Sequence, residues 1–327
     1  MRVAINGMGR IGRLLLRRLL EEQQFEVVAV NDIIPVENLA YLLKYDSIYG
    51  TYPGEIKTGA QSLTIKRKKI IALQDEHPEN LPWKEHSIDV VLECSGKFSD
   101  KTNVSKHLEA GAKKVLLSTT GADDIPLKVY GFNQNGSIAD LDLLSPGGCM
   151  TNCSVHVLYI LNSIGIDSAH INILHSYTSR QSLVDTSHAQ FRRGRAAAES
   201  IIPVAIDLHQ SLNRLLPALR DKINVFSTRV PVANGAMAEF TVQLKDNIST
   251  SEVNKLFKTA AQTEYKGILD YTDEPLVSLD IKGNTHSCII DSTQTSVIGN
   301  HARVVAWFDN EYGFTSRMID WLKYWKK

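Results

Sequence analysis

The pattern of hydrophobic and polar positions differs between two parts of the chain of 327 residues. In the first part, short apolar runs of the buried type alternate with segments whose apolar residues recur at helical spacing. Strands without polar alternation, each followed by a helix, are typical of a parallel sheet covered on both faces. The first part therefore predicts an α/β fold, with strands at 2–5, 25–30, 88–94 and 114–118.

This pattern changes after Cys149, where strand-like runs follow one another with fewer helices between them. This order favours a mostly antiparallel sheet with helices on one face, which is an α+β arrangement. At the end of the chain, Met318, Leu322 and Trp325 share one face of a helix expected at 315–327. The strand-like runs lie at 170–176, 225–232, 238–245, 276–281, 287–291 and 304–308.

A glycine-rich turn joins the first strand to the first helix. Gly7 allows a tight turn, Gly9 lets the backbone approach a pyrophosphate, and Gly12 lets the helix pack closely on the strand. Asp32 follows the second strand, twenty residues after Gly12, where a carboxylate accepts hydrogen bonds from the adenine-side ribose. The order of strand, glycines, helix, strand and acid predicts a Rossmann domain, and the carboxylate favours NAD because it would repel the extra phosphate of NADP.

Further strands of this first part end in small polar residues. Ser95 and Gly96 follow the strand at 88–94, and Ser118 ends the next one. Ligands of a parallel sheet bind at the carboxyl ends of its strands, which makes these residues candidates for cofactor contacts. An ordinary turn at a strand end explains each of them equally well.

Composition and charge indicate which partners, cofactors and cellular location to expect. Thirty-six basic and 36 acidic side chains give a formal charge of zero, so neither nucleic acid nor an anionic membrane is expected as a partner. No apolar run approaches the roughly 18 residues of a membrane span, and the first residues do not resemble a secretory signal. Four cysteines form neither a disulfide framework nor a metal-type cluster, so we expect no metal and a reducing, cytoplasmic location.

Cys149 lies at the point where a glycine-containing loop turns into a helix. Pro146, Gly147 and Gly148 end a strand expected at 140–144, and helical spacing follows the cysteine. The N–H groups at the start of a helix favour a thiolate over a thiol, and a thiolate is a nucleophile. This placement suits covalent catalysis. A small buried packing residue is the alternative, and this stretch alone leaves both interpretations open.

A long polar segment at 177–195 separates two of the later strands and contains four arginines. A loop of this length within a folded domain is more often functional than not. Its arginines are Arg180, Arg192, Arg193 and Arg195.

Together these motifs resemble the glyceraldehyde-3-phosphate dehydrogenase family from near the first residue to near the last. The matching segments occur in order along the chain, and 270–272 and 291–295 also resemble the related erythrose-4-phosphate dehydrogenases. The matching segments are 4–13, 43–47, 111–115, 151–153, 175–178, 195–198, 201–203, 229–231 and 307–311.

The resemblance implies an NAD-binding domain at 1–148, completed by the helix at 315–327, and a catalytic domain at 149–314. It implies that Cys149 attacks an aldehyde and that His175 activates the thiol. A neighbouring imidazolium would also lower the pKa of the thiol. It further implies a phosphorylated small-molecule substrate and a homotetramer.

The same resemblance assigns binding roles. Thr178 and Arg229 match positions that hold the substrate phosphate, and Arg195 matches a second anion site, where a planar guanidinium can pair two phosphate oxygens. Cys153 is interpreted as a packing residue. The other implied substrate contacts are Gly148 and Thr151, and the implied cofactor contacts are Gly7, Gly9, Arg10, Ile11, Gly12, Asp32, Ser118 and Asn310.

Some positions depart from the family pattern. Gly148 and Met150 replace hydroxyl residues, and Ile206-Asp207 replaces a Thr-Gly pair that helps to bind inorganic phosphate in the family. Lost donors forfeit hydrogen bonds, and a carboxylate repels a dianion. The hypothesis is that water replaces phosphate as acyl acceptor, as in the erythrose-4-phosphate type. An NAD-binding regulatory protein with weak catalysis is a further alternative, which the combination of Cys149 and His175 disfavours.

Overall fold

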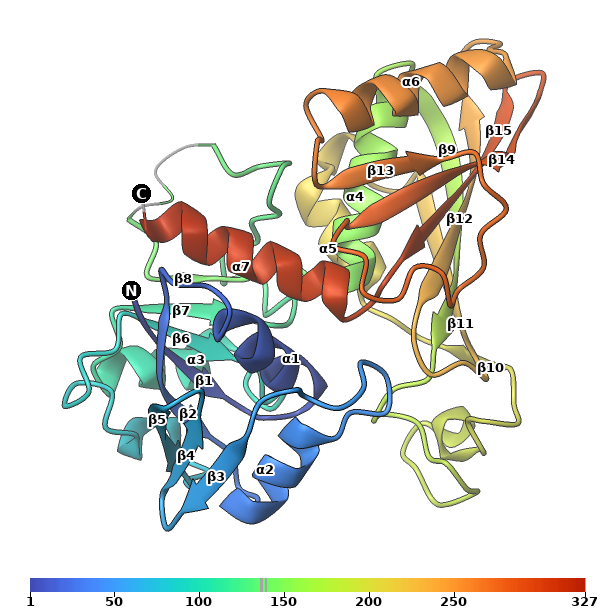
Figure 1. Cartoon of the computed structure of the whole chain (residues 1–327). Helices are drawn as coiled ribbons and strands as arrows, with labels where there is room; N and C mark the ends of the chain where they lie inside the picture. The colour runs from blue at the N-terminus through green and yellow to red at the C-terminus, as the bar shows by residue number, and fades with distance from the viewer. Residues whose placement is uncertain (136–137, 139, 327) are drawn as a thin grey trace. The chain divides into compact units, whose positions relative to one another are not determined.

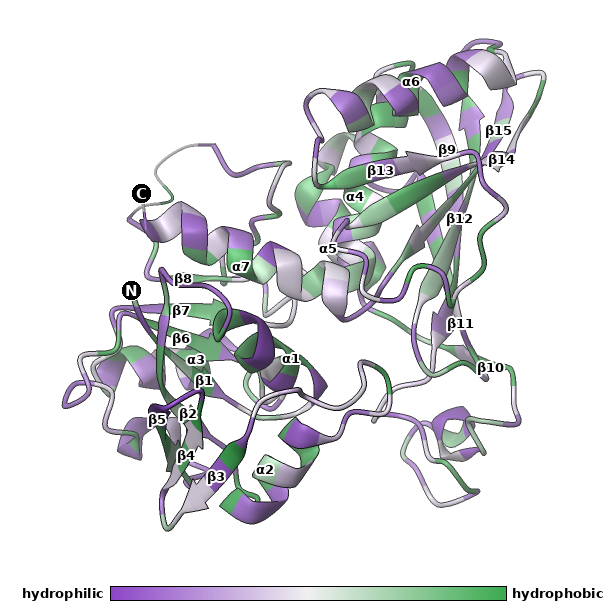
Figure 2. Ribbon diagram, viewed as in Figure 1, coloured by the Kyte–Doolittle hydropathy of each residue, from purple (hydrophilic) through white to green (hydrophobic). Residues whose placement is uncertain are grey.

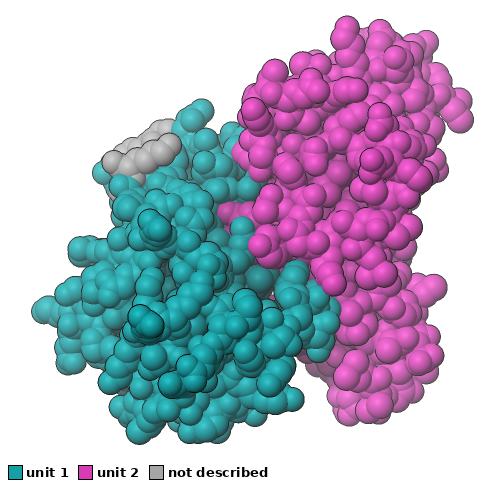
Figure 3. Space-filling model, viewed as in Figure 1, with its two compact units in different colours: residues 1–148, 317–327 teal, residues 149–316 magenta. Residues whose placement is uncertain are grey.

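The chain folds into two compact units, shown in different colours in Figure 3. The structure, a computed structural model, describes residues 1–135, 138 and 140–326. The first unit comprises residues 1–148 and 317–327, and the second comprises residues 149–316. The last position of the helix expected at 315–327, residue 327, lies outside the described residues.

An eight-stranded sheet forms the centre of the first unit, in the order β3-β4-β5-β2-β1-β6-β7-β8 (Figure 1). Neighbours from β5 to β8 pair in parallel, and β3, β4 and β5 form an antiparallel edge. The strands are β1 (Arg2–Asn6), β2 (Glu26–Asn31), β3 (Ile56–Gly59), β4 (Ser62–Ile65), β5 (Lys68–Leu73), β6 (Val90–Glu93), β7 (Lys114–Leu117) and β8 (Leu143–Leu144).

Helices connect these parallel strands by crossovers in both directions from the middle of the sheet. Helix α1 (Arg10–Leu19) leads from β1 to β2, whereas α3 (Lys101–Glu109) leads from β6 to the strand on the other side, β7. Because such crossovers are right-handed, α1 and α3 cover opposite faces. The order reverses between β1 and β6, which is where a doubly wound sheet opens its ligand crevice. The remaining helices of this part are α2 (Val36–Lys44) and the 3-10 turn η1 (Pro78–Asn80).

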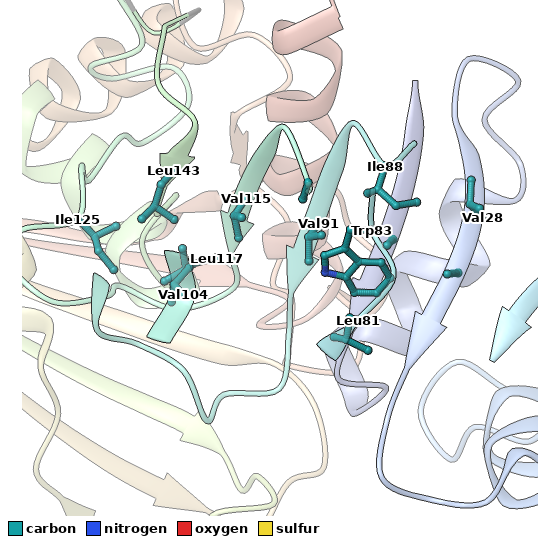
Figure 4. Close-up of a cluster of buried hydrophobic side chains, with 13 residues drawn as sticks. Val28, Leu81, Trp83, Ile88, Val91, Val104, Val115, Leu117, Ile125 and Leu143 are labelled. Atoms are coloured by element: carbon teal, nitrogen blue, oxygen red, sulfur yellow. The ribbon is translucent and has the colours of Figure 1, made fainter. Parts of the chain in front are cut away.

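The apolar runs of the sequence become the core of this unit. In Figure 2 the central strands are mostly green, the colour of hydrophobic residues. Figure 4 shows one buried cluster, in which Trp83 and Ile88 pack beside Val91 and Val115. Trp83 is fully buried, so its indole N–H needs a protein partner.

The C-terminal helix α7 (Tyr312–Lys326) begins three residues earlier than the sequence predicts. Asp309 explains the early start, because its Oδ1 accepts the backbone N–H of Tyr312 at 2.8 Å and caps the helix. Farther along α7, Trp321 is buried in the first unit with its ring edge-on to Tyr130. That part of the helix therefore belongs to the core of the first unit.

A seven-stranded sheet forms the second unit, in the order β10-β11-β9-β12-β15-β14-β13. Four of its neighbouring pairs are antiparallel, and only β11·β9 and β13·β14 are parallel. The α/β plus mostly antiparallel α+β prediction is confirmed. The strands are β9 (Ile166–Ser176), β10 (Ile202–Val204), β11 (Ile223–Val230), β12 (Ala236–Leu244), β13 (Leu269–Thr272), β14 (Cys288–Ile298) and β15 (His301–Phe308).

Helices cover one face of this sheet. Alternate residues of β12, including Ala238 and Phe240, are fully buried, whereas Met237 and Glu239 between them are partly exposed. A strand with this alternation has one covered face. The helices of the unit are α4 (Cys149–Asn162), α5 (Leu208–Leu215) and α6 (Thr250–Gln262), with 3-10 turns η2 (Phe191–Gly194) and η3 (Pro217–Leu219).

Two strand predictions are wrong in extent or place. The run at 276–281 contains no strand, and β13 (Leu269–Thr272) lies before it. The strand expected at 140–144 is only the two-residue β8, Leu143–Leu144. The long polar segment at 177–195 is held by its own backbone, because Ser182 donates to the carbonyl of Arg193 and Thr186 donates to that of Gly194. This segment is therefore an ordered loop that closes on itself.

Candidate active site

Cys149 and His175 face each other in the second unit. Gly147 has a φ of +76°, which lets the chain turn sharply before α4 begins at Cys149. His175 lies at the end of β9, paired with Arg229 of β11 on one side. Between the two side chains, Sγ of Cys149 lies 3.7 Å from Nε2 of His175.

The backbone orients the imidazole of His175. Its Nδ1 lies 2.8 Å from the carbonyl oxygen of Ser176, and a carbonyl only accepts, so Nδ1 holds the ring proton. The lone pair of Nε2 then points at the thiol of Cys149. A neutral imidazole in this tautomer can take a proton from sulfur as a general base.

The expectation that the start of α4 and a neighbouring imidazolium lower the pKa of Cys149 is not met in this structure. Burial raises the pKa of Cys149 to about 11, and this outweighs the opposing effects of Arg229 and of backbone N–H groups. Burial, followed by Arg229, lowers the pKa of His175 to about 3. Removing water penalises each charged form, so the resting pair is a thiol and a neutral imidazole.

Arg229 supplies the positive charge of the site. Only 7% of it is exposed; its Nη1 donates to the carbonyl of Ser176 at 3.3 Å, and its Nε has no hydrogen-bond partner among the described residues. Burial lowers its pKa to about 10, which leaves it charged at neutral pH. An incompletely paired buried guanidinium is suited to an anionic ligand.

A second buried guanidinium, Arg193, interacts electrostatically with Arg229. Arg193 donates from Nε to Gln190 at 2.6 Å and from Nη2 to the carbonyl of Ala205 at 3.3 Å. Its Nη1 is buried and finds no hydrogen-bond partner in the part of the chain that the structure describes. The two guanidiniums therefore create a positive region beside the nucleophile, and Asp207 lies close enough to Arg193 to offset part of that charge.

Thr178 is held by Gln181. The side-chain oxygen of Gln181 accepts the backbone N–H of Thr178 at 2.9 Å and its hydroxyl at 3.0 Å. Gln181 is buried, and its amide nitrogen has no partner among residues 1–135, 138 and 140–326. Thr178 and Gln181 thus present polar groups at the start of the arginine-containing loop.

The other expected substrate residues, and the cofactor residue Asn310, lie in different surroundings. Arg195 is exposed and pairs with Asp185 at 3.0 Å. Thr151 is buried in the first turn of α4, and Gly148 directly precedes that helix. Asn310 is buried in the second unit, where its Oδ1 accepts the N–H of Gly235 at 2.8 Å. With that oxygen occupied, the amide nitrogen of Asn310 is the group suited to bind an acceptor.

The glycine-rich turn of the first unit fits a dinucleotide pyrophosphate. Gly7 has a φ of +88°, and a Cβ at Gly12 would lie 2.1 Å from the carbonyl oxygen of Gly7, so both positions require glycine. A Cβ at Gly9 would meet no protein atom within 4 Å. Gly9 precedes α1, whose first N–H groups receive no side-chain cap. This open, uncapped helix end can accept an anion.

Asp32 lies directly against this turn. Its Oδ2 accepts the backbone N–H of Met8 at 2.6 Å, and a cavity of about 350 Å³ opens beside it, with Leu39 and Gln74 among the lining residues. Arg10, at the first position of α1, directs its guanidinium to Asp46. Ile11 follows Arg10 in α1, and the backbone N–H of Ser118, just after β7, donates to the carbonyl of Glu93 at 2.9 Å.

Sequence reasoning missed Arg193 and Gln181. No pattern in the sequence distinguishes Arg193 from the adjacent Arg192. The 3-10 turn Phe191–Gly194 separates them by burying Arg193 and leaving Arg192 exposed.

Among the described residues, none of the helices combines the length and the hydrophobicity that a membrane span requires. No group of three or more histidine, cysteine, aspartate or glutamate side chains is placed to hold a metal ion within those same residues.

Comparison with known proteins is consistent with this geometry. Residues 1–101 match the family model of the glyceraldehyde 3-phosphate dehydrogenase NAD binding domain, and residues 148–310 match that of its C-terminal domain. Glyceraldehyde-3-phosphate dehydrogenase 2 of Bacillus subtilis (strain 168) is 41% identical over 99% of this chain and 96% of its own length.

Two further relatives extend this likeness. Glyceraldehyde-3-phosphate dehydrogenase of Zymomonas mobilis is 41% identical over 98% of this chain and 96% of its own length. That of Borreliella burgdorferi is 40% identical over 98% of both chains. The chain therefore belongs to the glyceraldehyde-3-phosphate dehydrogenase family of NAD-dependent oxidoreductases.

Proposed function

We propose that this chain oxidises glyceraldehyde 3-phosphate with NAD through a thioester on Cys149. The observation that supports it most directly is the 3.7 Å approach of the Cys149 sulfur to Nε2 of His175, with the charged Arg229 beside them. The residues 1–148 with the C-terminal helix would bind NAD, and the residues 149–314 would bind the substrate.

The chemistry follows from the resting state of this pair. As the sulfur of Cys149 attacks the aldehyde carbon, Nε2 of His175 takes the thiol proton, and a thiohemiacetal forms. The imidazolium so created can donate to the former carbonyl oxygen. When bound, NAD would accept the hydride from the carbon of this adduct, and Nε2 of His175 would take back the hydroxyl proton, which leaves a thioester. The buried site delays ionisation until the substrate arrives, which protects the cysteine from other electrophiles.

Binding of the substrate phosphate is assigned to Thr178 and Arg229. Arg229 has a buried N–H group at Nε without a hydrogen-bond partner among the described residues, and the hydroxyl of Thr178 can turn from Gln181 to a ligand. Arg193 adds a further buried N–H group from the neighbouring loop. NAD is assigned to Gly7, Gly9, Arg10, Ile11, Gly12, Asp32 and Ser118 of the first unit and to Asn310 of the second.

The acyl acceptor, phosphate or water, distinguishes the proposed function from a second one. Gly148, Met150, Ile206 and Asp207 offer no side-chain hydroxyl, which favours water and an erythrose-4-phosphate dehydrogenase that releases 4-phosphoerythronate. The buried, incompletely paired Arg193 favours an anionic acceptor instead. An NAD-binding regulatory protein with weak catalysis would need neither the Cys149–His175 pair nor these guanidiniums.

One assay separates these functions. NADH absorbance is followed on mixing the enzyme and NAD with glyceraldehyde 3-phosphate or erythrose 4-phosphate, each with and without inorganic phosphate. Faster turnover of the triose with phosphate supports the proposal, whereas phosphate-independent turnover of the tetrose supports the alternative. Cys149→Ser must abolish either signal, and an intact enzyme that produces no NADH from either sugar contradicts both.

We also propose a cytoplasmic homotetramer. Four free cysteines suit a reducing compartment. Large apolar side chains are exposed along the arginine-containing loop and just before β10, and such surfaces mark protein interfaces. These side chains are Leu183, Val184, Phe191 and Ile201. Sedimentation equilibrium measures the mass, and a monomer at micromolar concentration would refute the assembly.

A further inference from the structure

Glu93 is a buried carboxylate that the proposed chemistry does not use. It ends β6 in the first unit and is 2% exposed. Its Oε1 accepts the backbone N–H of Ser95 at 2.7 Å and the hydroxyl of the same residue at 2.5 Å. Its Oε2 accepts Nδ2 of Asn6 at 2.6 Å and lies 2.9 Å from Nε2 of His107. Both oxygens are therefore saturated by protein donors.

The direction of the hydrogen bond from His107 is fixed by Trp83. The indole nitrogen of Trp83 can only donate, and it lies 3.0 Å from Nδ1 of His107. Nδ1 must therefore accept, which places the ring proton on Nε2, facing Glu93. Trp83 itself is locked in the buried cluster of Figure 4. The packing of the core thus determines which way this histidine donates.

The network continues across the carboxyl ends of the neighbouring strands. Asn6 ends β1 and is the register partner of both Glu93 in β6 and Asn31 in β2. Asn31 donates from Nδ2 to Oδ1 of Asn6 at 2.7 Å and to the carbonyl of Asp75 at 2.8 Å. Side-chain hydrogen bonds therefore tie together three strand ends at the point where the sheet order reverses.

The glycine-rich turn rests directly on this network. A Cβ at Gly7 would lie 2.3 Å from the Cα and the nitrogen of Ser95, so the two backbones touch. Ser95 cannot move toward the turn without displacing it, and Glu93 holds the backbone N–H and the hydroxyl of Ser95. The carboxylate therefore sets the distance between the two loops that border the crevice.

From this arrangement we infer that Glu93 is a positioning residue for the dinucleotide. By holding Ser95 and Asn6, it fixes the glycine-rich turn in the shape that accepts the pyrophosphate, without contacting the ligand itself. The inference rests on the proposed placement of NAD at this turn.

The test compares four variants in NAD binding, followed by calorimetry, and in steady-state kinetics. Glu93→Gln places an amide nitrogen against Asn6 or Ser95, and we expect the Kd and KM for NAD to rise about tenfold while kcat at saturating NAD is kept. Asn6→Asp opposes two carboxylates and should weaken NAD binding similarly. The double variant Asn6→Asp/Glu93→Gln restores a donor and an acceptor at this contact. Its amide nitrogen then faces the N–H of His107, so only part of the affinity should be recovered. Glu109→Gln, on the exposed side of α3, is the matched control and should leave NAD binding unchanged.

Each outcome decides the inference. Wild-type affinity in folded Glu93→Gln, or a loss of kcat with an unchanged KM for NAD, would overturn it. If Glu93→Gln does not fold, the comparison of Asn6→Asp with the double variant decides in its place, and a double variant that binds no better than Asn6→Asp contradicts the coupling. If both Glu93 variants fail to fold, normal NAD binding by Asn6→Asp overturns the inference. A wild-type protein that binds no NAD would instead refute the proposed function.

Discussion

Nε2 of His175 lies 3.7 Å from the sulfur of Cys149, and burial keeps both groups neutral. The pair is therefore organised as an acid and a base awaiting a carbonyl. An ion pair would show a reactive thiolate throughout the neutral pH range, whereas a thiol beside an imidazole does not. The distinction is measurable in the unliganded enzyme.

Burial raises the pKa of Cys149 to about 11, so its alkylation rate should rise with pH up to that value. The thiolate is the reactive species, so below that pH the rate should increase about tenfold per pH unit. Iodoacetamide labelling of the peptide containing Cys149, followed by mass spectrometry in the absence of NAD and substrate, measures this rate. A plateau across the neutral range would show that the pair is ionised at rest.

His175 should make the protein less stable in acid. The pKa of His175 falls from 6.5 to about 3 on folding, so the unfolded chain binds this proton first. Its effect is absent above pH 6.5, and as pH falls from 6.5 towards 3 it should cost about 1.4 kcal/mol of unfolding free energy per pH unit. Urea titrations at several pH values, compared with His175→Asn, isolate this contribution. Equal slopes in both proteins would contradict the assignment.

Replacing Arg193 should weaken the binding of an anionic substrate far more than replacing Arg192. Arg193→Ala removes a buried cation beside Arg229, and we expect the KM for the phosphorylated aldehyde or for inorganic phosphate to rise at least about tenfold. Arg192→Ala, at an exposed position of the same 3-10 turn, is the control and should behave like the wild type. Steady-state kinetics with each substrate varied in turn shows which anion Arg193 serves. Unchanged KM values for the aldehyde and for inorganic phosphate would show that Arg193 binds neither anion.

Asp309 should stabilise the second unit. Its carboxylate caps α7 by accepting from Glu311 at 2.9 Å and Tyr312 at 2.8 Å, and its other oxygen accepts the N–H of Gly283 at 2.8 Å. Asp309→Ala removes the carboxylate that these N–H groups donate to and should lower the unfolding free energy by about 2 kcal/mol. Chemical denaturation measures the change, and a loss below about 0.5 kcal/mol would show that water replaces the carboxylate.

The sequence predicts those features that depend on local pattern. The glycine spacing predicts the turn, and the loop before Cys149 predicts a helix that begins at that residue. Periodicity also predicts the class of each sheet. All of these depend on residues close together along the chain. The hydrogen bond from Met8 to Asp32 was not among the predictions.

Features that depend on distant contacts could not be predicted in this way. Whether Cys149 ionises depends on how much water the folded chain excludes, and this reverses the effect expected from the helix end. Arg193 differs from Arg192 and Arg195 only through burial. Glu93 acquires its partners from β1, from α3 and from the loop after its own strand, which no pattern in the sequence connects.

Restoring hydroxyl groups around Cys149 should increase the dependence on phosphate. Gly148 has space for a side chain, because a Cβ there would meet no protein atom within 4 Å, and its φ is not in the left-handed region. Gly148→Ser combined with Met150→Thr adds two donors beside the nucleophile, and each new charge-assisted hydrogen bond can stabilise a bound dianion by about 1.5–3 kcal/mol. The double variant should therefore lower the KM for inorganic phosphate by at least about tenfold and shift the product towards the acyl phosphate. Product analysis at fixed NAD and aldehyde, with Gly148→Ala/Met150→Leu as a control without hydroxyls, separates hydrogen bonding from changes in shape. An equal effect in both double variants would mean that Gly148 and Met150 do not determine the acceptor through lost hydroxyls.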